Sequence, residues 1–445
     1  MALHGNRIGA ADRYGRIAGL AALLCCSLAG ALLPLRPAAG QSAVLDASGI
    51  AAGAIGCAPS NNGTGHLECA EYTAGNGLAA VSWQAPPGPN GVPNAPAATE
   101  AVGTVDHLAL ATPAGPPKGV PGCATAADGA GTLICLVEIT SGSNVLLQAL
   151  SFALTQPTPT SSALTTVATL PASDTIGNPG CTNGGNAGQN APFGPQALCV
   201  LVINGALYAV NDTLAAPAAP SFTALSSLGS GFTGTPGCAT VQPTATLDFV
   251  ALCAVRNTGG LLAFAFDAKG VLGSKQLADE PFTGDPSCTP PLDKSLTAIC
   301  AIAGSDTLRG FAIPYVQGGA FAPGAYQTLG TPADTGKWAG TVGCAPPNDT
   351  ENAANLVTCT ALSSAEAAFV VTFDPRAGTL YGPTGPFFSA ASAVDSVPSC
   401  IMLNVDPDQI TCGATTSNGG TAAFNLPVGR VSPAVQHAIL SIFRH

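Results

Sequence analysis

Cysteine spacing constrains this chain more than any other feature of its sequence. The phrase PGCATVQPTATLDFVALC, residues 236–253, holds two cysteines with a polar stretch between them. Similar phrases recur along the chain, such as IGCAP, PGCTN and PSCTP around a first cysteine and HLEC, TLIC and QITC before a second. They define seven pairs: Cys57/Cys69, Cys123/Cys135, Cys181/Cys199, Cys238/Cys253, Cys288/Cys300, Cys344/Cys359 and Cys400/Cys412. This recurrence indicates a repeat architecture.

Each repeat carries the pattern of four short β-strands. The first cysteines follow one another at intervals of 66, 58, 57, 50, 56 and 56 residues. After a second cysteine come an apolar run, a turn signal and another apolar run, as in LCVLVI, NG and ALYAV, where Asn204-Gly205 is a strong hairpin signal. Alternation with β-branched and aromatic residues is typical of strands. The strand that carries the first cysteine precedes these two strands, and a segment such as residues 222–228 follows them, which gives four strands in each repeat.

Four antiparallel strands at a period near fifty residues predict an all-β, seven-bladed β-propeller. A string of small β modules and a β-helix are the alternatives. The last repeat lacks a fourth strand after residues 422–427, so we predict that residues 43–47 form the outermost strand of the seventh blade and close the ring. The propeller then spans residues 41–427, with repeats starting near Cys57, Cys123, Cys181, Cys238, Cys288, Cys344 and Cys400.

The two cysteines of each pair are predicted to lie opposite each other on adjacent strands. Opposite residues have Cα atoms about 4.5 to 5.5 Å apart, which is within reach of a disulfide. One disulfide in each blade would contribute about 3 kcal/mol in the chain-entropy model. No C-x-x-C spacing exists, so we expect no metal site and no cofactor. Asp406 and Asp408 could hold calcium, but a solvated turn is the favoured interpretation.

The first 40 residues have the pattern of an export signal. A basic front precedes an apolar stretch at residues 17–35, and residues 38–40 (AAG) offer small side chains for a cleavage before Gln41. An uncleaved membrane anchor is the alternative. No later stretch is long and apolar enough to span a bilayer. Because paired cysteines require an oxidising compartment, we expect a secreted, periplasmic or cell-surface protein.

Charge narrows the range of partners. Without residues 1–40 the chain has 10 basic and 24 acidic residues, a net charge of −14. Proteins that bind nucleic acids or anionic lipids use clustered Lys and Arg, so we expect neither as a partner. A net negative charge of this size also favours a protein that repels its own copies.

Residues 225–267 carry a leucine-glycine turn, a proline entering the inner strand, a Leu-Asp pair before an apolar strand, an Arg-x-Thr-x-Gly-type turn and an amphipathic third strand. These elements are Leu228-Gly229, Pro236, Leu247-Asp248, Arg256-Asn257-Thr258-Gly259 and Leu261 to Phe266. The combination resembles one blade of the seven-bladed bacterial and fungal fucose-binding lectin propellers. Those lectins stack several tryptophans on sugars, whereas this chain has two, Trp83 and Trp338. The cysteine pair is also unusual there, so the resemblance implies the fold and does not carry sugar binding across.

Two segments stand outside the repeat. Residues 84–104 form a proline-rich insertion, which we interpret as a solvated or polyproline-like loop. Residues 428–445 form a tail in which the apolar positions after Ser432-Pro433 share one face, and this pattern predicts a short amphipathic helix.

The sequence holds no local catalytic motif, since H-E-x-x-H, G-x-S-x-G, a phosphate loop and a dinucleotide fingerprint are all missing. Asp106-His107 is an adjacent acid–histidine pair, but it lies in a predicted outer strand, where neighbouring side chains face opposite ways. Asp248, Asp267 and Asp374 lie at strand edges, where carboxylates cap turns. We therefore expect a non-enzymatic protein.

Trp338, in the phrase TGKWAGTVGC, is the candidate ligand-binding residue. It precedes the inner strand of the sixth repeat, so we expect it in a loop at the rim of the ring beside Lys337. An exposed indole there could stack on a sugar face. The alternative, which we favour, is an indole packed between blades.

Three functions remain open. A secreted or envelope-associated binding or adhesion protein, lectin-like or protein-binding, fits best because no catalytic set is visible. A hydrolase or lyase acting on a polysaccharide and a structural envelope or assembly protein are the alternatives. Carboxylates converging at the mouth of the channel would favour the enzyme, and exposed aromatic residues between blades would favour the lectin. A polar channel with an apolar rim patch would favour assembly.

Overall fold

The computed structural model describes the strand at 42–46 and, from residue 55 on, the segments 55–59, 66–73, 75–84, 105–110, 112–126, 131–154, 160–183, 196–213, 220–243, 249–267, 269–278, 282–290, 295–304, 306–345, 356–365, 367–385, 399–401, 409–415 and 421–427. The predicted export signal, the insertion after Gln84, Asp406 with Asp408, and the tail at 428–445 lie outside the described residues. All described strands belong to the unit that spans Gly40–His445.

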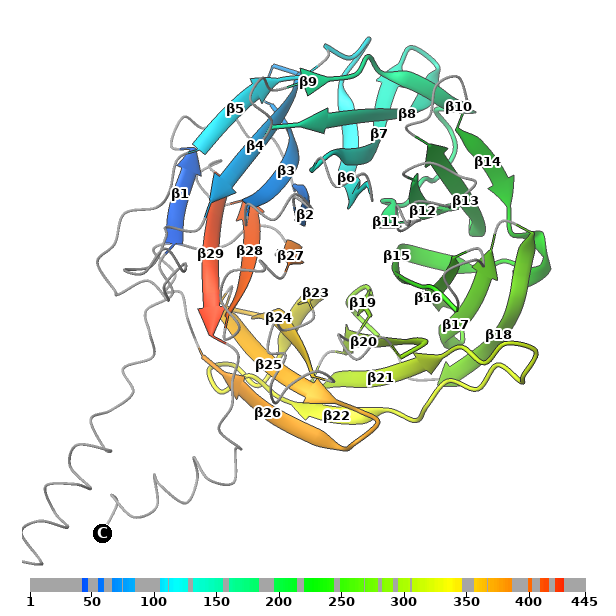
Figure 1. Cartoon of the computed structure of the whole chain (residues 1–445), viewed down its shortest axis with the longest axis vertical. Coiled ribbons are helices and arrows are strands. Elements are labelled where there is room, and N and C mark those ends of the chain that lie inside the picture. The colour runs from blue at the N-terminus through cyan, green and yellow to red at the C-terminus, as the bar shows by residue number, and fades with distance from the viewer. Residues whose placement is uncertain are drawn as a thin grey trace, which may run out of the picture. The chain divides into compact units, whose positions relative to one another are not determined.

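The described strands form seven antiparallel sheets, which we number blades 1 to 7 (Figure 1). Blades 1 to 3 contain β2 (Gly56–Pro59), β3 (His66–Tyr72), β4 (Leu78–Gln84) and β5 (Val105–Ala109); β6 (Pro117–Thr125), β7 (Leu133–Ser141), β8 (Asn144–Ala153), β9 (Thr160–Ser161) and β10 (Thr165–Pro171); and β11 (Gly180–Asn183), β12 (Gln196–Ile203), β13 (Ala206–Thr213) and β14 (Ser221–Ala224). Blades 4 to 6 contain β15 (Phe232–Val241), β16 (Val250–Asn257), β17 (Gly260–Asp267) and β18 (Gly270–Ala278); β19 (Ser287–Thr289), β20 (Thr297–Ala303), β21 (Leu308–Pro314) and β22 (Gln327–Gly330); and β23 (Trp338–Ala345), β24 (Val357–Ser363), β25 (Ala368–Asp374) and β26 (Thr379–Thr384). Blade 7 contains β27 (Ser399–Ile401), β28 (Gln409–Thr415), β29 (Thr421–Pro427) and β1 (Ser42–Asp46), and a short 3-10 helix, η1 (Ser226–Leu228), follows blade 3.

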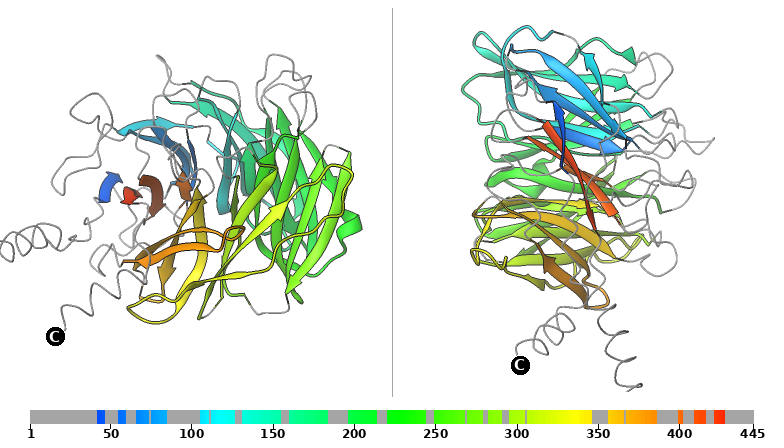
Figure 2. Two further views of the ribbon diagram at one scale, coloured as in Figure 1. Left: turned by 60° about the horizontal axis from the view of Figure 1, so that its bottom comes forward. Right: turned by 90° about the vertical axis from the view of Figure 1, so that its left-hand side faces the viewer.

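Within this unit, neighbouring blades touch through their innermost strands. Contacts join β2 to β6, β6 to β11, β11 to β15, β15 to β19, β19 to β23, β23 to β27, and β27 to β2. Figures 1 and 2 show the sheets following one another around a centre. Six sheets have four strands and blade 2 has a fifth, β9, which pairs with β8. Such a cyclic series of antiparallel sheets is a β-propeller, as the repeat predicted.

The N-terminal strand lies in the last blade. β1 pairs antiparallel with β29, with Ser42 opposite Phe424 and Ala43 opposite Ala423. The order of strands in this blade is β1-β29-β28-β27, so β1 is the outermost (Figure 1). The predicted strand at 43–47 is thus present one residue earlier than expected.

The structure contains each of the seven predicted disulfides, and each joins residues that lie opposite each other in register. The Cα atoms of the bonded cysteines are 4.0 to 4.2 Å apart, slightly closer than expected. The bonds are Cys57–Cys69, Cys123–Cys135, Cys181–Cys199, Cys238–Cys253, Cys288–Cys300, Cys344–Cys359 and Cys400–Cys412.

The second cysteine of each disulfide lies in the core, at 3% exposure or less. These buried residues are Cys69, Cys135, Cys199, Cys253, Cys300, Cys359 and Cys412. Each lies on the second strand of its blade, whose faces are covered by the neighbouring blades. They are therefore structural residues and are not part of a surface that a ligand could reach.

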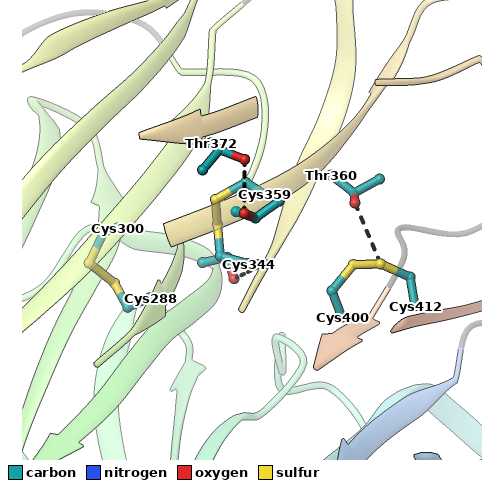
Figure 3. The surroundings of a disulfide bond; sticks show 10 residues. Cys288, Cys300, Cys344, Cys359, Thr360, Thr372, Cys400 and Cys412 are labelled. Carbon is teal, nitrogen blue, oxygen red and sulfur yellow. Dashed lines mark hydrogen bonds between the residues drawn. A yellow bond between two sulfur atoms is a disulfide. The ribbon is translucent and has the colours of Figure 1, made fainter. Parts of the chain in front are cut away.

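Figure 3 shows the disulfides of blades 5, 6 and 7. The Thr360 hydroxyl of blade 6 lies 3.5 Å from Cys412 Sγ of blade 7. The disulfide of blade 7 therefore also contacts blade 6.

The hydrophobic core is divided among the junctions between blades. One cluster joins Leu133 and Phe152 of blade 2 to Ala70 and Tyr72 of blade 1, and comparable clusters join blades 2 to 3, 3 to 4, 4 to 5 and 5 to 6. Alternating strand residues face opposite neighbours, so both faces of an inner strand are apolar. Blades 2 to 5 therefore each pack against both of their neighbours.

The recurring Pro-Gly-Cys phrase has a steric cause. A Cβ on the glycine before the first cysteine would collide with the carbonyl oxygen of the proline two residues before the next blade's first cysteine. This holds for Gly56 against Pro121, Gly122 against Pro179, Gly180 against Pro236 and Gly237 against Pro286. Blade 5 has Ser287 at this position, and its hydroxyl accepts a hydrogen bond of 3.1 Å from the Cys344 amide. The phrase thus permits close contact between inner strands.

Candidate ligand-binding junction between two blades

Trp338 is buried, which rules out the exposed indole at the rim and agrees with the favoured interpretation, an indole packed between blades. Its side chain is in the core at 4% exposure, because it begins strand β23 instead of standing in a loop. The indole Nε1 donates to the Gly330 carbonyl of blade 5 at 3.1 Å, and the ring packs edge-on to Phe369 at 5.8 Å. The indole lies between blades, as the alternative interpretation had it, and offers no face to a sugar.

Lys337 precedes this strand and is exposed. Its carbonyl accepts hydrogen bonds from the Ser364 amide at 3.0 Å and from the Thr335 hydroxyl at 3.1 Å, so its backbone closes a turn. Since the Trp338 indole turns inward, the two predicted residues do not share an exposed surface.

Two of the three carboxylates assigned to turns, Asp267 and Asp374, do cap turns, and Asp248 lies outside the described residues. Asp267 Oδ1 accepts from the amides of Lys269 and Gly270 at 2.7 and 3.1 Å. Asp374 Oδ1 accepts from the backbone amide and Nε of Arg376 at 2.9 and 3.1 Å. Among the described residues, no group of three or more His, Cys, Asp or Glu is placed to hold a metal ion.

The junction of blades 2 and 3 combines polar and aromatic side chains. On blade 2, Lys118 lies opposite Glu138 in the β6–β7 register. Glu138 lies opposite Leu147 on β8, and Leu147 lies opposite Ala168 on β10. Leu136, two residues before Glu138, packs in the cluster shared with blade 3. Because strand side chains alternate between faces, Glu138 also faces blade 3.

Glu138 is a buried carboxylate without a hydrogen-bond donor. The residue is 1% exposed, and neither carboxylate oxygen has a hydrogen-bond partner. Burial raises the pKa of Glu138 to about 7, while the charge of Lys118 partly opposes this rise. The carboxyl group therefore changes its charge near neutral pH.

Tyr72 of blade 1 holds the backbone around Glu138. The β6–β7 register shifts between Lys118 and Gly122, which interrupts the ladder. The Tyr72 hydroxyl bridges this interruption: it donates to the Lys118 carbonyl and accepts from the Glu138 amide, both at 3.3 Å. Burial raises the pKa of Tyr72 well above its ordinary value, so the hydroxyl stays protonated and can donate.

Asn178 of blade 3 and Gly119 of blade 2 lie close to the Glu138 carboxylate. Asn178 Oδ1 accepts from the Val120 amide at 3.0 Å. Gly119 is exposed and has φ +71°, and a Cβ there would lie 2.5 Å from Asn178 Oδ1 and 3.7 Å from Glu138 Oε1. Only glycine suits this position, and its exposed backbone lies close to the Glu138 carboxylate.

The outer part of the same junction is aromatic. Tyr208 on β13 and Phe222 on β14 stack with their ring centroids 5.0 Å apart and their planes within 6°. Both side chains are half-buried, and they pack against a cluster that also contains Val167 and Leu170 of blade 2. The junction thus has a polar inner end, a buried middle at Leu147 and an aromatic outer end.

None of these junction residues stood out in the sequence by a local motif. The available signal was positional, since Tyr72, Glu138 and Arg256 each follow the second cysteine of their repeat by three residues. In a strand that is otherwise apolar, a large polar residue at one repeated position marks a junction. Which neighbour it meets depends on the register, which the sequence does not show.

No protein-family model matches the chain, and no curated protein sequence matches it. AofleA from Arthrobotrys oligospora is 9% identical with a TM-score of 0.46, over 78% of this chain and 90% of its own. The SapL1 lectin, solved with alpha methyl fucoside, is 13% identical with a TM-score of 0.39, over 74% and 95%. A puromycin hydrolase is 13% identical with a TM-score of 0.42, over 86% and 55%. The resemblance to lectin propellers is thus found at the level of the fold, where binding proteins and enzymes both occur, and it carries no argument about function.

The part of the chain that the structure describes contains no helix of the length and apolarity that a membrane crossing requires. Seven disulfides indicate an oxidising compartment outside the cytosol.

Proposed function

We propose that the chain is a secreted or envelope-associated, non-enzymatic binding protein that recognises carbohydrate at the junction of blades 2 and 3. One observation carries the proposal: the stacked pair of Tyr208 and Phe222 is half-buried between two blades. Partly exposed aromatic faces are the feature that we expected of a lectin. Aromatic rings provide a large apolar contact area with a fixed geometry, which suits the apolar face of a sugar ring.

The scaffold supports this proposal. Each blade carries a disulfide, and the inner strands touch too closely to admit a Cβ at several junctions. A rigid surface loses little conformational freedom when it binds a ligand, so more of the contact energy is available for affinity. The SapL1 lectin was solved with a fucoside, and fucosides are therefore a sensible first group of glycans to test.

A glycan array with the oxidised protein tests the proposal. We expect binding to at least one group of glycans, and we expect Tyr208→Leu and Phe222→Leu each to weaken it by about tenfold, which is ~1.4 kcal/mol. Leucine keeps apolar bulk and removes the aromatic face. Tyr381→Leu in β26 is the matched control, because Tyr381 is also half-buried but lies in blade 6. An array without binding would remove the carbohydrate proposal.

Polysaccharide hydrolysis is the second candidate, because burial raises the pKa of Glu138 to about 7, which suits an acid catalyst. Glycoside hydrolysis commonly needs a second carboxylate about 5 to 9.5 Å away. Incubating each bound glycan with the wild-type protein and with Glu138→Gln separates the candidates. Binding without turnover supports the first, whereas turnover that Glu138→Gln abolishes supports the second.

A further inference from the structure

The junction of blades 4 and 5 shows what the inner end of a junction can hold. Arg256 on β16 reaches across to Asp285, which precedes β19: Nε lies 2.8 Å and Nη2 lies 2.7 Å from Asp285 Oδ1. Nη1 also donates to the Phe282 carbonyl at 3.4 Å. The side chains of Arg256 and Asp285 are 24% and 15% exposed. A guanidinium group therefore joins the two blades through N–H donors on a carboxylate.

The junction of blades 2 and 3 has the same arrangement of positions, occupied by different residues. Glu138 follows Cys135 by three residues, as Arg256 follows Cys253, and Asn178 precedes Cys181 by three residues, as Asp285 precedes Cys288. The two junctions also share a glycine with positive φ four residues before the first cysteine of the blade: Gly119 at +71° and Gly234 at +77°.

The two junctions differ in the charges that occupy these matching positions. Between blades 4 and 5, the Asp285 carboxylate accepts hydrogen bonds from the Arg256 guanidinium. Between blades 2 and 3, Glu138 occupies the position of Arg256, and Asn178 occupies the position of Asp285. Glutamate is shorter than arginine by the guanidinium head. The groups that face Glu138 are Lys118, Asn178 and the Tyr72 hydroxyl, and none of them donates a hydrogen bond to its carboxylate oxygens. A buried carboxylate without donors is costly.

We propose that the inner end of the junction between blades 2 and 3 binds a small organic cation, a guanidinium or primary ammonium group, on Glu138. The N–H donors of this cation take the part that the Arg256 guanidinium takes on Asp285. The exposed Gly119 backbone marks the side from which the cation enters, because glycine carries no side chain of its own and the nearest atoms beside it belong to Asn178 and Glu138. The inference rests on the proposed binding function and assigns a ligand chemistry to the polar end of the same junction.

Lys118 is the competing cation within the chain. It lies opposite Glu138 in register, and its charge lowers the pKa of that carboxyl, but it forms no ion pair with Glu138 within 4.0 Å. Removing its charge should therefore strengthen the binding of an external cation. A merely structural Lys118–Glu138 pair predicts the opposite, because the pair would then be lost and nothing would replace it.

The test is thermal unfolding of the oxidised protein near pH 8 at constant ionic strength. The probes are methylguanidinium chloride and glucosamine hydrochloride, with tetramethylammonium chloride as a cation that has no N–H donor. We expect the first two to raise the Tm of the wild-type protein in a concentration-dependent way, with a larger rise in Lys118→Met and none in Glu138→Gln. Glu71→Gln is the matched control, since Glu71 is equally buried on β3, and it should keep the full rise.

Several outcomes would overturn the inference. They are an equal rise with tetramethylammonium, an equal rise in Glu138→Gln, the loss of the rise in Lys118→Met, or no rise in the wild type. If Glu138→Gln fails to fold, Glu138→Asp replaces it, and the rise should then be smaller than in the wild type. If methylguanidinium raises the Tm and glucosamine does not, the site binds guanidinium groups. If glucosamine raises the Tm and methylguanidinium does not, the site binds amino sugars. Because the probes are small cations, an empty glycan array leaves this result unaffected.

Discussion

Glu138 makes the stability of the protein depend on pH. Burial raises its pKa from 4.5 to about 7, so the folded protein holds the proton more tightly than the unfolded chain. The resulting stabilisation is fully present below about pH 4.5, is lost as the pH rises towards 7, and changes little above that. The nearby Lys118 charge reduces the effect, and the protonated Tyr72 hydroxyl does not titrate in this range.

The Glu138→Gln variant tests this account. We expect it to match the wild type near pH 4 and to be more stable by about 3 kcal/mol near pH 8, because the pKa rises from 4.5 to about 7 and one pKa unit corresponds to about 1.4 kcal/mol. Urea unfolding under non-reducing conditions at the two pH values measures the difference. Parallel pH profiles for the two proteins would show that Glu138 does not carry the dependence.

At the scale of the element, the inner strands depend on glycine next to the first cysteine. Gly180→Ala would place a Cβ against the Pro236 carbonyl of the next blade, where backbone meets backbone and neither can move alone. We expect a loss of about 2–3 kcal/mol, the upper part of the usual range for overpacking. Gly75→Ala is the control, since a Cβ there meets nothing within 4 Å. Equal unfolding midpoints in urea for the two variants would contradict the steric explanation.

The strands were predictable because alternation and turn residues act locally. Asn204-Gly205, for example, forms the predicted hairpin between β12 and β13, with both residues at positive φ. The disulfides were predictable because each pair lies in adjacent strands of one repeat. The burial of second cysteines such as Cys199 and Cys300 was not predictable, because it is the neighbouring blades that cover them. Pairing is a property of one repeat, whereas burial is a property of the ring.

The candidate site was not predictable for the same reason. Trp338 was expected in a loop, but its strand begins at that residue and its indole packs on blade 5. Glu138 and Tyr208 were not singled out at all, because their role depends on which blade they face. Register across three strands sets that direction, and no local pattern in the sequence reports it.

At the scale of the whole molecule, β1 covers the outer edge of β29 in blade 7. An uncovered strand edge leaves unpaired amide and carbonyl groups and invites association. We expect a chain that starts after residue 47 to unfold at a lower temperature than one that starts at residue 41. We also expect it to associate more readily. Calorimetry and size-exclusion chromatography of the two chains measure both effects, and identical behaviour would mean that β1 does not contribute to the closure of the unit.

The central claim is that seven repeats form seven blades, each joined by its own disulfide. Mass spectrometry of the protein digested without reduction tests it most directly. We predict seven bridges, each between cysteines 12 to 18 residues apart in sequence. Bridges between different repeats, or free thiols at these positions, would contradict both the blade structure and the junction between blades 2 and 3 that depends on it.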